Sequence, residues 1–180
     1  MGKEMILILG GARSGKSAYA QSLIEGNGGQ VLFVATATAG DEEMASRIRV
    51  HIANRPKHWK TLEAPLHVGD AIQKTERTEW ILLDCVTLLI SNLMMAMPEP
   101  LDEKEALMVV QQEIDELIAA YQSHPGRWVI VSNEVGLGLV PPYPLGRYYR
   151  DALGRANQQL AKVADKVIFM MAGIAMKIKG

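Results

Sequence analysis

Residues 10–17 read Gly-Gly-Ala-Arg-Ser-Gly-Lys-Ser and match the pattern G-x-x-x-x-G-K-[ST] at every fixed position. The segment follows a continuous apolar run, residues 5–9, and opens a stretch with the composition of a helix. Its glycines let backbone N–H groups approach phosphate oxygens closely, and the helix N-terminus favours negative charge. We therefore expect Lys16 to contact the β- and γ-phosphates of a nucleotide and the Ser17 hydroxyl to bind Mg²⁺.

A carboxylate partner for this loop is expected at the end of a later strand. Trp80–Asp84 has that form, with four apolar residues followed by an aspartate. Asp84 would contact the Mg²⁺ shell or a nucleotide hydroxyl, and the alternative is an acidic strand end that faces solvent. Together the two features indicate a P-loop nucleotide-binding protein, a class that includes kinases, ATPases and switches.

The elements that must position these residues alternate between strand and helix along the chain. Runs without polar alternation are typical of strands buried on both faces of a parallel sheet. The predicted strands are residues 5–9, 31–35, 80–83, 128–132, 167–171 and 175–178. The predicted helices are residues 17–25, 41–52, 86–97 and 145–164, a surface helix from His67, and a long helix that Asp102 opens with Glu105 as in a capping box. This order predicts an α/β fold with a mostly parallel sheet flanked by helices and an antiparallel pair at the C-terminus.

Length and composition narrow the class further. With 180 residues the chain is the size of a single domain, so residues 1–180 are expected to form one P-loop nucleotide-binding domain. Nineteen basic against twenty acidic residues give a net charge of −1, which offers no support for nonspecific nucleic-acid binding. One cysteine, Cys85, cannot form an internal disulfide or a cysteine zinc cage. No apolar run is long enough for a membrane span, and we expect a cytoplasmic protein.

Three further blocks identify a family that the loop alone does not. They are residues 47–63, residues 132–141, which contain Asn-Glu-Val-Gly-x-Gly-x-Val-Pro, and residues 149–158, which contain Arg-Asp-x-x-Gly-x-x-Asn-Gln. With the loop, these resemble the bifunctional adenosylcobinamide kinase / adenosylcobinamide-phosphate guanylyltransferase of cobalamin biosynthesis. The resemblance runs over nearly the whole chain. It implies a P-loop fold of the RecA-like kind and a homotrimer.

The resemblance also implies two reactions. The enzyme phosphorylates the aminopropanol hydroxyl of adenosylcobinamide with ATP or GTP, and then transfers GMP from GTP to the resulting phosphate through a GMP–histidine intermediate. The histidine falls on His51, where family members can carry two adjacent histidines and this chain has Val50 before it. The implied cofactor is Mg²⁺ with GTP or ATP, and Lys16 joins His51 as a catalytic residue.

Nucleotide contacts are carried over from the family position by position. They fall on Gly10, Gly11, Ala12, Arg13, Ser14, Gly15, Lys16, Ser17, Thr36, Ala37, Thr38, Ile52, Ala53, Asn54, Arg55, Glu63 and Asp84. Arg55 is a candidate phosphate clamp or a cation that satisfies helix-end carbonyls. Glu63 is a candidate for guanine or ribose recognition or a solvated glutamate. Asp84 departs from family members that have glutamate there, and its shorter side chain can shift the contact.

Several residues keep two interpretations at this point. Asn133 and Glu134 would position a substrate hydroxyl, water or Mg²⁺, or serve turn geometry alone. Core packing and an adaptable surface for a corrin ring are alternatives for Met94, Met95 and Met97. A helix-surface ion pair with a subunit contact is expected for Arg150, Asp151 and Asn157. The other histidines, His58, His67 and His124, are expected to be structural or surface residues.

Two other functions compete with the bifunctional enzyme. A P-loop small-molecule kinase without guanylyl transfer would not need His51. A nucleotide-binding switch or assembly module would bind nucleotide without turning over cobinamide, and it would not need the segment between His51 and Glu63.

Overall fold

A sheet of seven strands forms the centre of the computed structural model, which describes residues 2–53 and 55–180, the side chain of Arg47 excepted. The strand order is β3-β2-β4-β5-β1-β6-β7. The strands are β1 Met5–Gly10, β2 Val31–Ala35, β3 Lys60–Glu63, β4 Trp80–Asp84, β5 Arg127–Val131, β6 Lys166–Met171 and β7 Ile174–Lys179. The pairs are parallel except β6 with β7, which is antiparallel as the short connection predicts.

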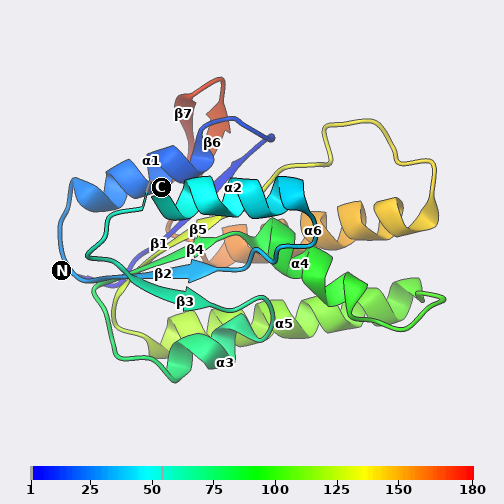
Figure 1. Cartoon of the computed structure of the whole chain (residues 1–180), viewed down its shortest axis with the longest axis horizontal. Helices are drawn as coiled ribbons and strands as arrows, with labels where there is room; N and C mark the ends of the chain where they lie inside the picture. Colours follow the sequence, from blue (N-terminus) through cyan, green and yellow to red (C-terminus); the bar gives the residue numbers. More distant parts are fainter. Residues whose placement is uncertain (1, 54) are drawn as a thin grey trace.

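Helices cover both faces of this sheet, which gives three layers (Figure 1). The helices are α1 Lys16–Glu25, α2 Glu42–Ala53, α3 Val68–Gln73, α4 Val86–Met95, α5 Glu103–Ser123 and α6 Pro144–Val163. Figure 1 shows α1 and α2 on one side of the sheet, with α3, α5 and α6 on the other. No helix within the described ranges is long and apolar enough to cross a membrane.

The strands are apolar without alternation because both of their faces are covered. In β1, Met5 and Leu7 pack into the cluster beneath α3–α6, whereas Ile6 and Ile8 pack into the cluster beneath α1. The same division holds along β2, β4 and β5. A continuous apolar run therefore predicts these central strands well.

Predicted and observed elements agree except at the edge of the sheet. Strand β3 is not predicted, because Leu62 is its only apolar residue and the strand pairs with β2 alone. The Asp102 side chain accepts a hydrogen bond from the Glu105 backbone N–H at 2.9 Å, which confirms the predicted start of α5. The helix expected from His67 is α3, with Val68 and Ile72 buried.

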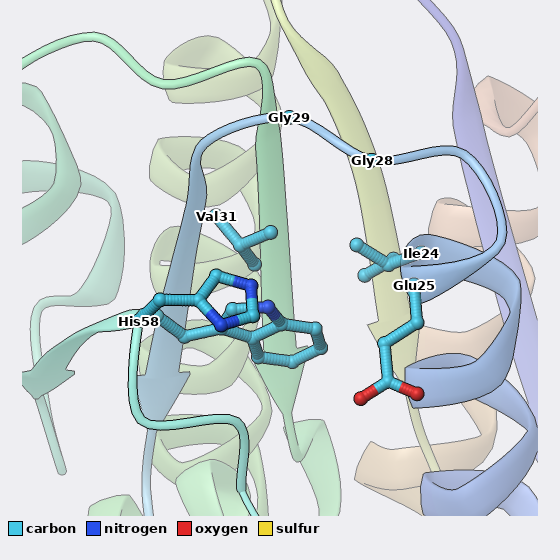
Figure 2. Close-up of a pocket in the computed structure, with 7 residues that line it drawn as sticks. Ile24, Glu25, Gly28, Gly29, Val31 and His58 are labelled. Atoms are coloured by element: carbon cyan, nitrogen blue, oxygen red, sulfur yellow. The ribbon is translucent and has the colours of Figure 1, made fainter.

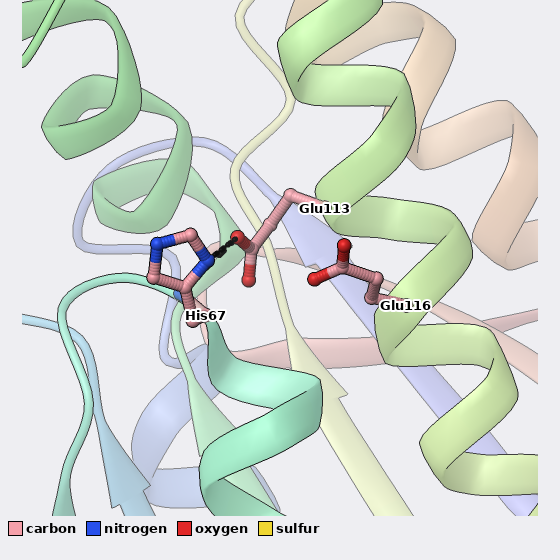
Figure 3. A group of neighbouring side chains, drawn as sticks. All are labelled: His67, Glu113 and Glu116. Atoms are coloured by element: carbon pink, nitrogen blue, oxygen red, sulfur yellow. Dashed lines mark hydrogen bonds and ion pairs between the residues drawn. The ribbon is translucent and has the colours of Figure 1, made fainter.

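Helix α3 is held against α5 by one buried carboxylate (Figure 3). Glu113 is 3 % exposed and accepts hydrogen bonds from the backbone N–H groups of His67 at 3.1 Å and Val68 at 2.8 Å. Glu116 and the His67 ring lie close to the same carboxylate. Because the Glu113 oxygens already bind the start of α3, this group has the construction of a helix cap.

Four parallel strands end at one edge of the sheet and bring the predicted site residues there. Ala35 at the end of β2 is in register with Glu63 of β3 and with Asp84 of β4. Strand β1 runs parallel to β5 and delivers residues 10–17 to the same edge. Since β5 lies between β1 and β4, the loop and Asp84 are separated by one strand, the RecA-like arrangement.

Candidate active site

The phosphate loop takes a conformation that needs both of its motif glycines. Gly15 is the N-cap of α1 with φ of 96°, in the left-handed region that other residues rarely adopt. A Cβ on Gly10 would lie 2.4 Å from the Met170 carbonyl oxygen of β6. In the same hairpin, the Gly173 backbone N–H donates to the Ser14 carbonyl at 3.1 Å. The loop is thus fixed between β1 and the β6–β7 hairpin.

Lys16 lies over the loop from which it starts. Its Nζ donates to the Gly11 carbonyl oxygen at 2.6 Å, and the side chain is buried. Burial lowers the pKa of Lys16, while the neighbouring Cys85 and Asp84 act in the opposite direction. The ammonium therefore lies at the glycine loop, and it would have to exchange one hydrogen bond to contact a bound phosphate.

Asp84 and Ser17 meet at the mouth of this loop. The Ser17 hydroxyl lies beside the Asp84 carboxylate, and both side chains line one pocket. Burial raises the pKa of Asp84, and the Ser17 hydrogen bond and the nearby His51, Lys16 and Arg55 oppose that shift. A hydroxyl and a carboxylate in contact are the oxygen ligands that Mg²⁺ prefers when it arrives with a nucleotide, so the donor set fits the predicted cofactor.

A pocket of about 160 Å³ joins Ser17 and Asp84 to the end of α2. Its lining residues are Ser17, Ala18, Gln21, Phe33, His51, Arg55, Leu82 and Asp84. Four predicted site residues, Ser17, His51, Arg55 and Asp84, therefore share one pocket, although they come from three separate segments. Sequence reasoning missed Gln21 and Phe33, because a polar residue on a helix and a phenylalanine in a buried strand carry no signal of a site.

Arg55 is held over the sheet by two contacts. Its guanidinium carbon lies 3.5 Å from the centroid of the Phe33 ring, and its Nη1 donates to Thr61 Oγ1 at 2.7 Å. Burial lowers the pKa of Arg55, and the negative charges of Asp84 and Glu63 oppose this. The negative charge of Glu63 therefore lies near Arg55, but Glu63 is not among the residues that line the pocket.

The segment after β2 is tied to α4 by its own polar groups. Thr36 Oγ1 donates to the Cys85 carbonyl at 2.7 Å and accepts from the Cys85 N–H at 2.9 Å. Asn92 Nδ2 donates to the Thr36 carbonyl at 2.7 Å, and Thr38 Oγ1 donates to Asn92 Oδ1 at 3.3 Å. The Thr36 side chain is buried and already makes two hydrogen bonds, so a nucleotide contact here would fall on other atoms, including those of the half-buried Ala37.

The remaining predicted contacts lie at the two ends of this site. Ile52 and Ala53 are exposed in the last turn of α2, and the predicted contact at Asn54 lies outside the described residues. In the loop, Gly11, Ala12 and Arg13 are exposed, whereas Ser14 is buried. The loop therefore exposes residues 11–13 between Gly10 and Gly15, whose positions the fold fixes.

The other three histidines lie away from the phosphate loop. His58 lines a separate hollow of about 220 Å³ with Trp59 and the end of α1 (Figure 2). That hollow includes Val31, where β2 begins, and so lies at the opposite edge of the sheet. His67 precedes α3, and the buried His124 accepts a hydrogen bond from the Gly126 N–H through Nδ1 at 3.0 Å.

Asn133 and Glu134, which follow β5, connect the phosphate loop to helix α4. The Glu134 backbone N–H donates to the Gly10 carbonyl at 3.0 Å, and its carboxylate accepts from the Gly136 N–H at 2.6 Å. The Asn133 N–H donates to Thr87 Oγ1 at 2.7 Å. The turn interpretation is therefore supported, and the backbone of this segment buttresses the phosphate loop.

Asn157 corrects one expectation from the sequence. Arg150 and Asp151 form the expected ion pair, with Arg150 Nε 3.4 Å from Asp151 Oδ1. Asn157, however, is 5 % exposed, and its Nδ2 donates to the Asn133 carbonyl at 3.0 Å. The predicted surface contact is wrong for this residue, because it links α6 to the segment after β5.

The three methionines of α4 and its end divide between the two interpretations. Met94 is buried in the core cluster and Met97 is half-buried against it. Met95 is 81 % exposed. Core packing accounts for the first two, and a surface role stays open for Met95.

The sheet order, the glycine loop with Lys16, and the Ser17–Asp84 pair define a P-loop nucleotide-binding protein. A model of the family described as cobinamide kinase / cobinamide phosphate guanyltransferase matches residues 6–178. The chain belongs to this family of enzymes.

Curated relatives cover nearly the whole chain. The bifunctional adenosylcobalamin biosynthesis protein CobU of Escherichia coli is 44 % identical over 97 % of this chain and 99 % of its own. The protein of the same name from Salmonella typhimurium is 45 % identical with the same coverage. The bifunctional adenosylcobalamin biosynthesis protein CobP of Pseudomonas aeruginosa is 44 % identical over 97 % of this chain and 96 % of its own.

Proposed function

We propose that this enzyme phosphorylates adenosylcobinamide with ATP or GTP and then transfers GMP from GTP to adenosylcobinamide phosphate through a GMP–His51 intermediate. The products of the second reaction are adenosylcobinamide-GDP and pyrophosphate. One observation carries the proposal: His51, near the end of α2, lines the same pocket as Ser17 and Asp84, which come from other segments of the chain. A plain kinase gives no reason for a histidine at this place.

The guanylyl transfer proceeds in two displacements in this proposal. A neutral imidazole nitrogen of His51 attacks the α-phosphorus of GTP, the new P–N bond forms, and the bond to the pyrophosphate oxygen breaks. A phosphate oxygen of the corrinoid substrate then attacks the same phosphorus and releases His51. Lys16 and Arg55 stabilise the negative charge that develops on the phosphates. Mg²⁺, held through Ser17 and Asp84, would neutralise charge on the leaving group.

The kinase reaction uses the same loop. Backbone N–H groups of residues 10–17 and Lys16 hold the triphosphate while the γ-phosphoryl group passes to the substrate hydroxyl. Because there is one such motif in the sequence, ATP and GTP compete for it. Kinase turnover does not need His51, so the two activities can be separated by substitution.

The test is the intact mass of the protein after incubation with GTP and Mg²⁺, kept away from acid because a P–N bond is acid-labile. We compare the wild type with His51→Ala, and with His58→Ala as the matched control at the opposite edge of the sheet. A gain of one GMP in the wild type and in His58→Ala, absent from His51→Ala, supports the intermediate. An adduct that persists in His51→Ala refutes it.

A second arm separates the plain kinase from the bifunctional enzyme. The same three proteins are incubated with ATP and cobinamide, and phosphorylated product is measured. His51→Ala should retain this activity. Phosphorylation without any GMP adduct in the wild type, even with the phosphorylated corrinoid present, would support a kinase without guanylyl transfer.

Assembly and location belong to the same proposal. The family resemblance supports a homotrimer in the cytoplasm. The exposed apolar side chains of edge strand β7, Ile174, Met176 and Ile178, also suit a subunit contact. Light scattering coupled to size exclusion measures the mass, and three times 19.8 kDa is the expected result.

A further inference from the structure

The site stands on two rows of side chains that cross three neighbouring strands. Phe33 of β2 is in register with Thr61 of β3 and Leu82 of β4. Two residues further along each strand, Ala35 is in register with Glu63 and Asp84. Residues two apart on a strand share a face of the sheet, so both rows face the side that carries α1.

Arg55 lies on the first row and faces the second. The guanidinium lies over the face of the Phe33 ring, and its hydrogen bond to Thr61 restricts how it can turn there. The Arg55 Nε is buried and has no hydrogen-bond partner among the described residues. A guanidinium has five N–H donors, so most remain for a ligand.

The two contacts differ in what else they do for the fold. Phe33 is 8 % exposed and belongs to the core beneath α1. Thr61 is exposed on the edge strand and lies in neither core cluster. Packing therefore explains a phenylalanine at position 33, but it does not explain a hydroxyl at position 61.

We propose that Phe33 and Thr61 are positioning residues that hold the Arg55 guanidinium ready for the phosphates of the nucleoside triphosphate bound at residues 10–17. This inference rests on the proposed role of Arg55 in nucleotide binding. Pre-orientation matters because an arginine carries much rotamer entropy, and fixing it before binding strengthens the complex.

The test is a double-mutant cycle on the affinity for GTP, read by calorimetry in the His51→Ala background. If His51 is the nucleophile, no GMP adduct forms in this background and the titration reports GTP binding alone. If His51 is not the nucleophile, its replacement still leaves a measurable affinity for GTP. Failure of the guanylyl-histidine proposal is thus distinguishable from failure of this one. The variants are Thr61→Val, Thr61→Ser and Arg55→Ala, alone and combined.

Thr61→Val should weaken GTP binding about threefold to tenfold, because the Arg55 side chain would then have to be immobilised on binding. Thr61→Ser should retain nearly all of the affinity, because it keeps the hydroxyl. In Arg55→Ala the further change Thr61→Val should have no effect. Thr75→Val is the matched control, since its hydroxyl bonds Ile72 on α3, away from the site, and it should leave GTP affinity unchanged.

Phe33 is tested in the same cycle. Phe33→Leu should weaken GTP binding in the presence of Arg55 and much less in Arg55→Ala, with urea unfolding measured alongside because Phe33 is also a core residue. If Thr61→Val binds GTP as tightly as the unsubstituted chain, or lowers affinity equally with and without Arg55, the proposal is overturned.

Discussion

Replacing Glu113 by alanine removes the acceptor for two backbone N–H groups at the start of α3. Glu113 accepts from Val68 at 2.8 Å in a buried place and from His67 at 3.1 Å in a partly exposed one. A hydrogen bond to a charged group contributes about 1.5–3 kcal/mol to stability. A buried N–H that is left without an acceptor costs this full amount, because water cannot replace the lost partner. Water can reach the His67 N–H, so its loss is smaller. We expect a total of about 2–4 kcal/mol, a large share of the roughly 5–15 kcal/mol that stabilises a domain.

Urea unfolding followed by tryptophan fluorescence measures this change, with the free energy extrapolated to water. Glu113→Gln keeps one acceptor oxygen and should lose about half as much. Glu116→Ala is the matched control: its carboxylate accepts from an exposed Gln112 side chain, so the loss should stay within about 0.5 kcal/mol. If Glu113→Ala loses less than about 1 kcal/mol, the carboxylate does not cap α3 and the reasoning fails.

Three further predictions test other parts of the structure. Gly10→Ala should lower the free energy of unfolding by about 1–3 kcal/mol and abolish GTP binding, because its Cβ would collide with the β6 backbone. Gly11→Ala is the control: its Cβ meets nothing within 4 Å, so its stability in urea unfolding should stay unchanged. His124 is held neutral as an acceptor for the Gly126 N–H; burial, then nearby Arg77 and Lys3, lower its pKa below the ordinary 6.5. Since the unfolded state then binds more protons, the free energy of unfolding should fall as the pH drops below about 6.5, and His124→Asn should flatten this decline; an equal decline in both proteins would contradict it. Asn157→Leu should lose about 1–3 kcal/mol in urea unfolding and make residues 134–143 easier to cleave in limited proteolysis, and an unchanged cleavage rate would mean that this side chain does not hold the segment.

The central strands could be predicted from sequence because burial on both faces leaves a continuous apolar run. Strand β3 could not, since its pairing with β2 uses backbone groups and leaves only Leu62 as a sign in the sequence. The phosphate loop was also predictable, because its chemistry lies within eight consecutive residues. Asn157 was not, because nothing local distinguishes an asparagine that faces solvent from one that donates to a distant carbonyl.

The second half of the site depends on contacts between segments far apart in the chain. His51 and Arg55 were identified by resemblance to a family, and only the fold shows that they share a pocket with Ser17 and Asp84. Phe33 has the pattern of a core residue and Thr61 that of a surface residue. Their contacts with Arg55 are tertiary contacts, which residue types and spacing in the sequence do not reveal.

The contact between the phosphate loop and the β6–β7 hairpin has a consequence for the protein during its synthesis. Gly10 pairs with Met170, and Ser14 is held by Gly173, so the loop is completed by residues made about 160 positions later. Strand β1 likewise lies between β5 and β6, both late in the chain. A nascent chain on the ribosome therefore carries the whole glycine motif long before the loop can take its folded conformation, and we expect nucleotide binding only after the last two strands have emerged and docked.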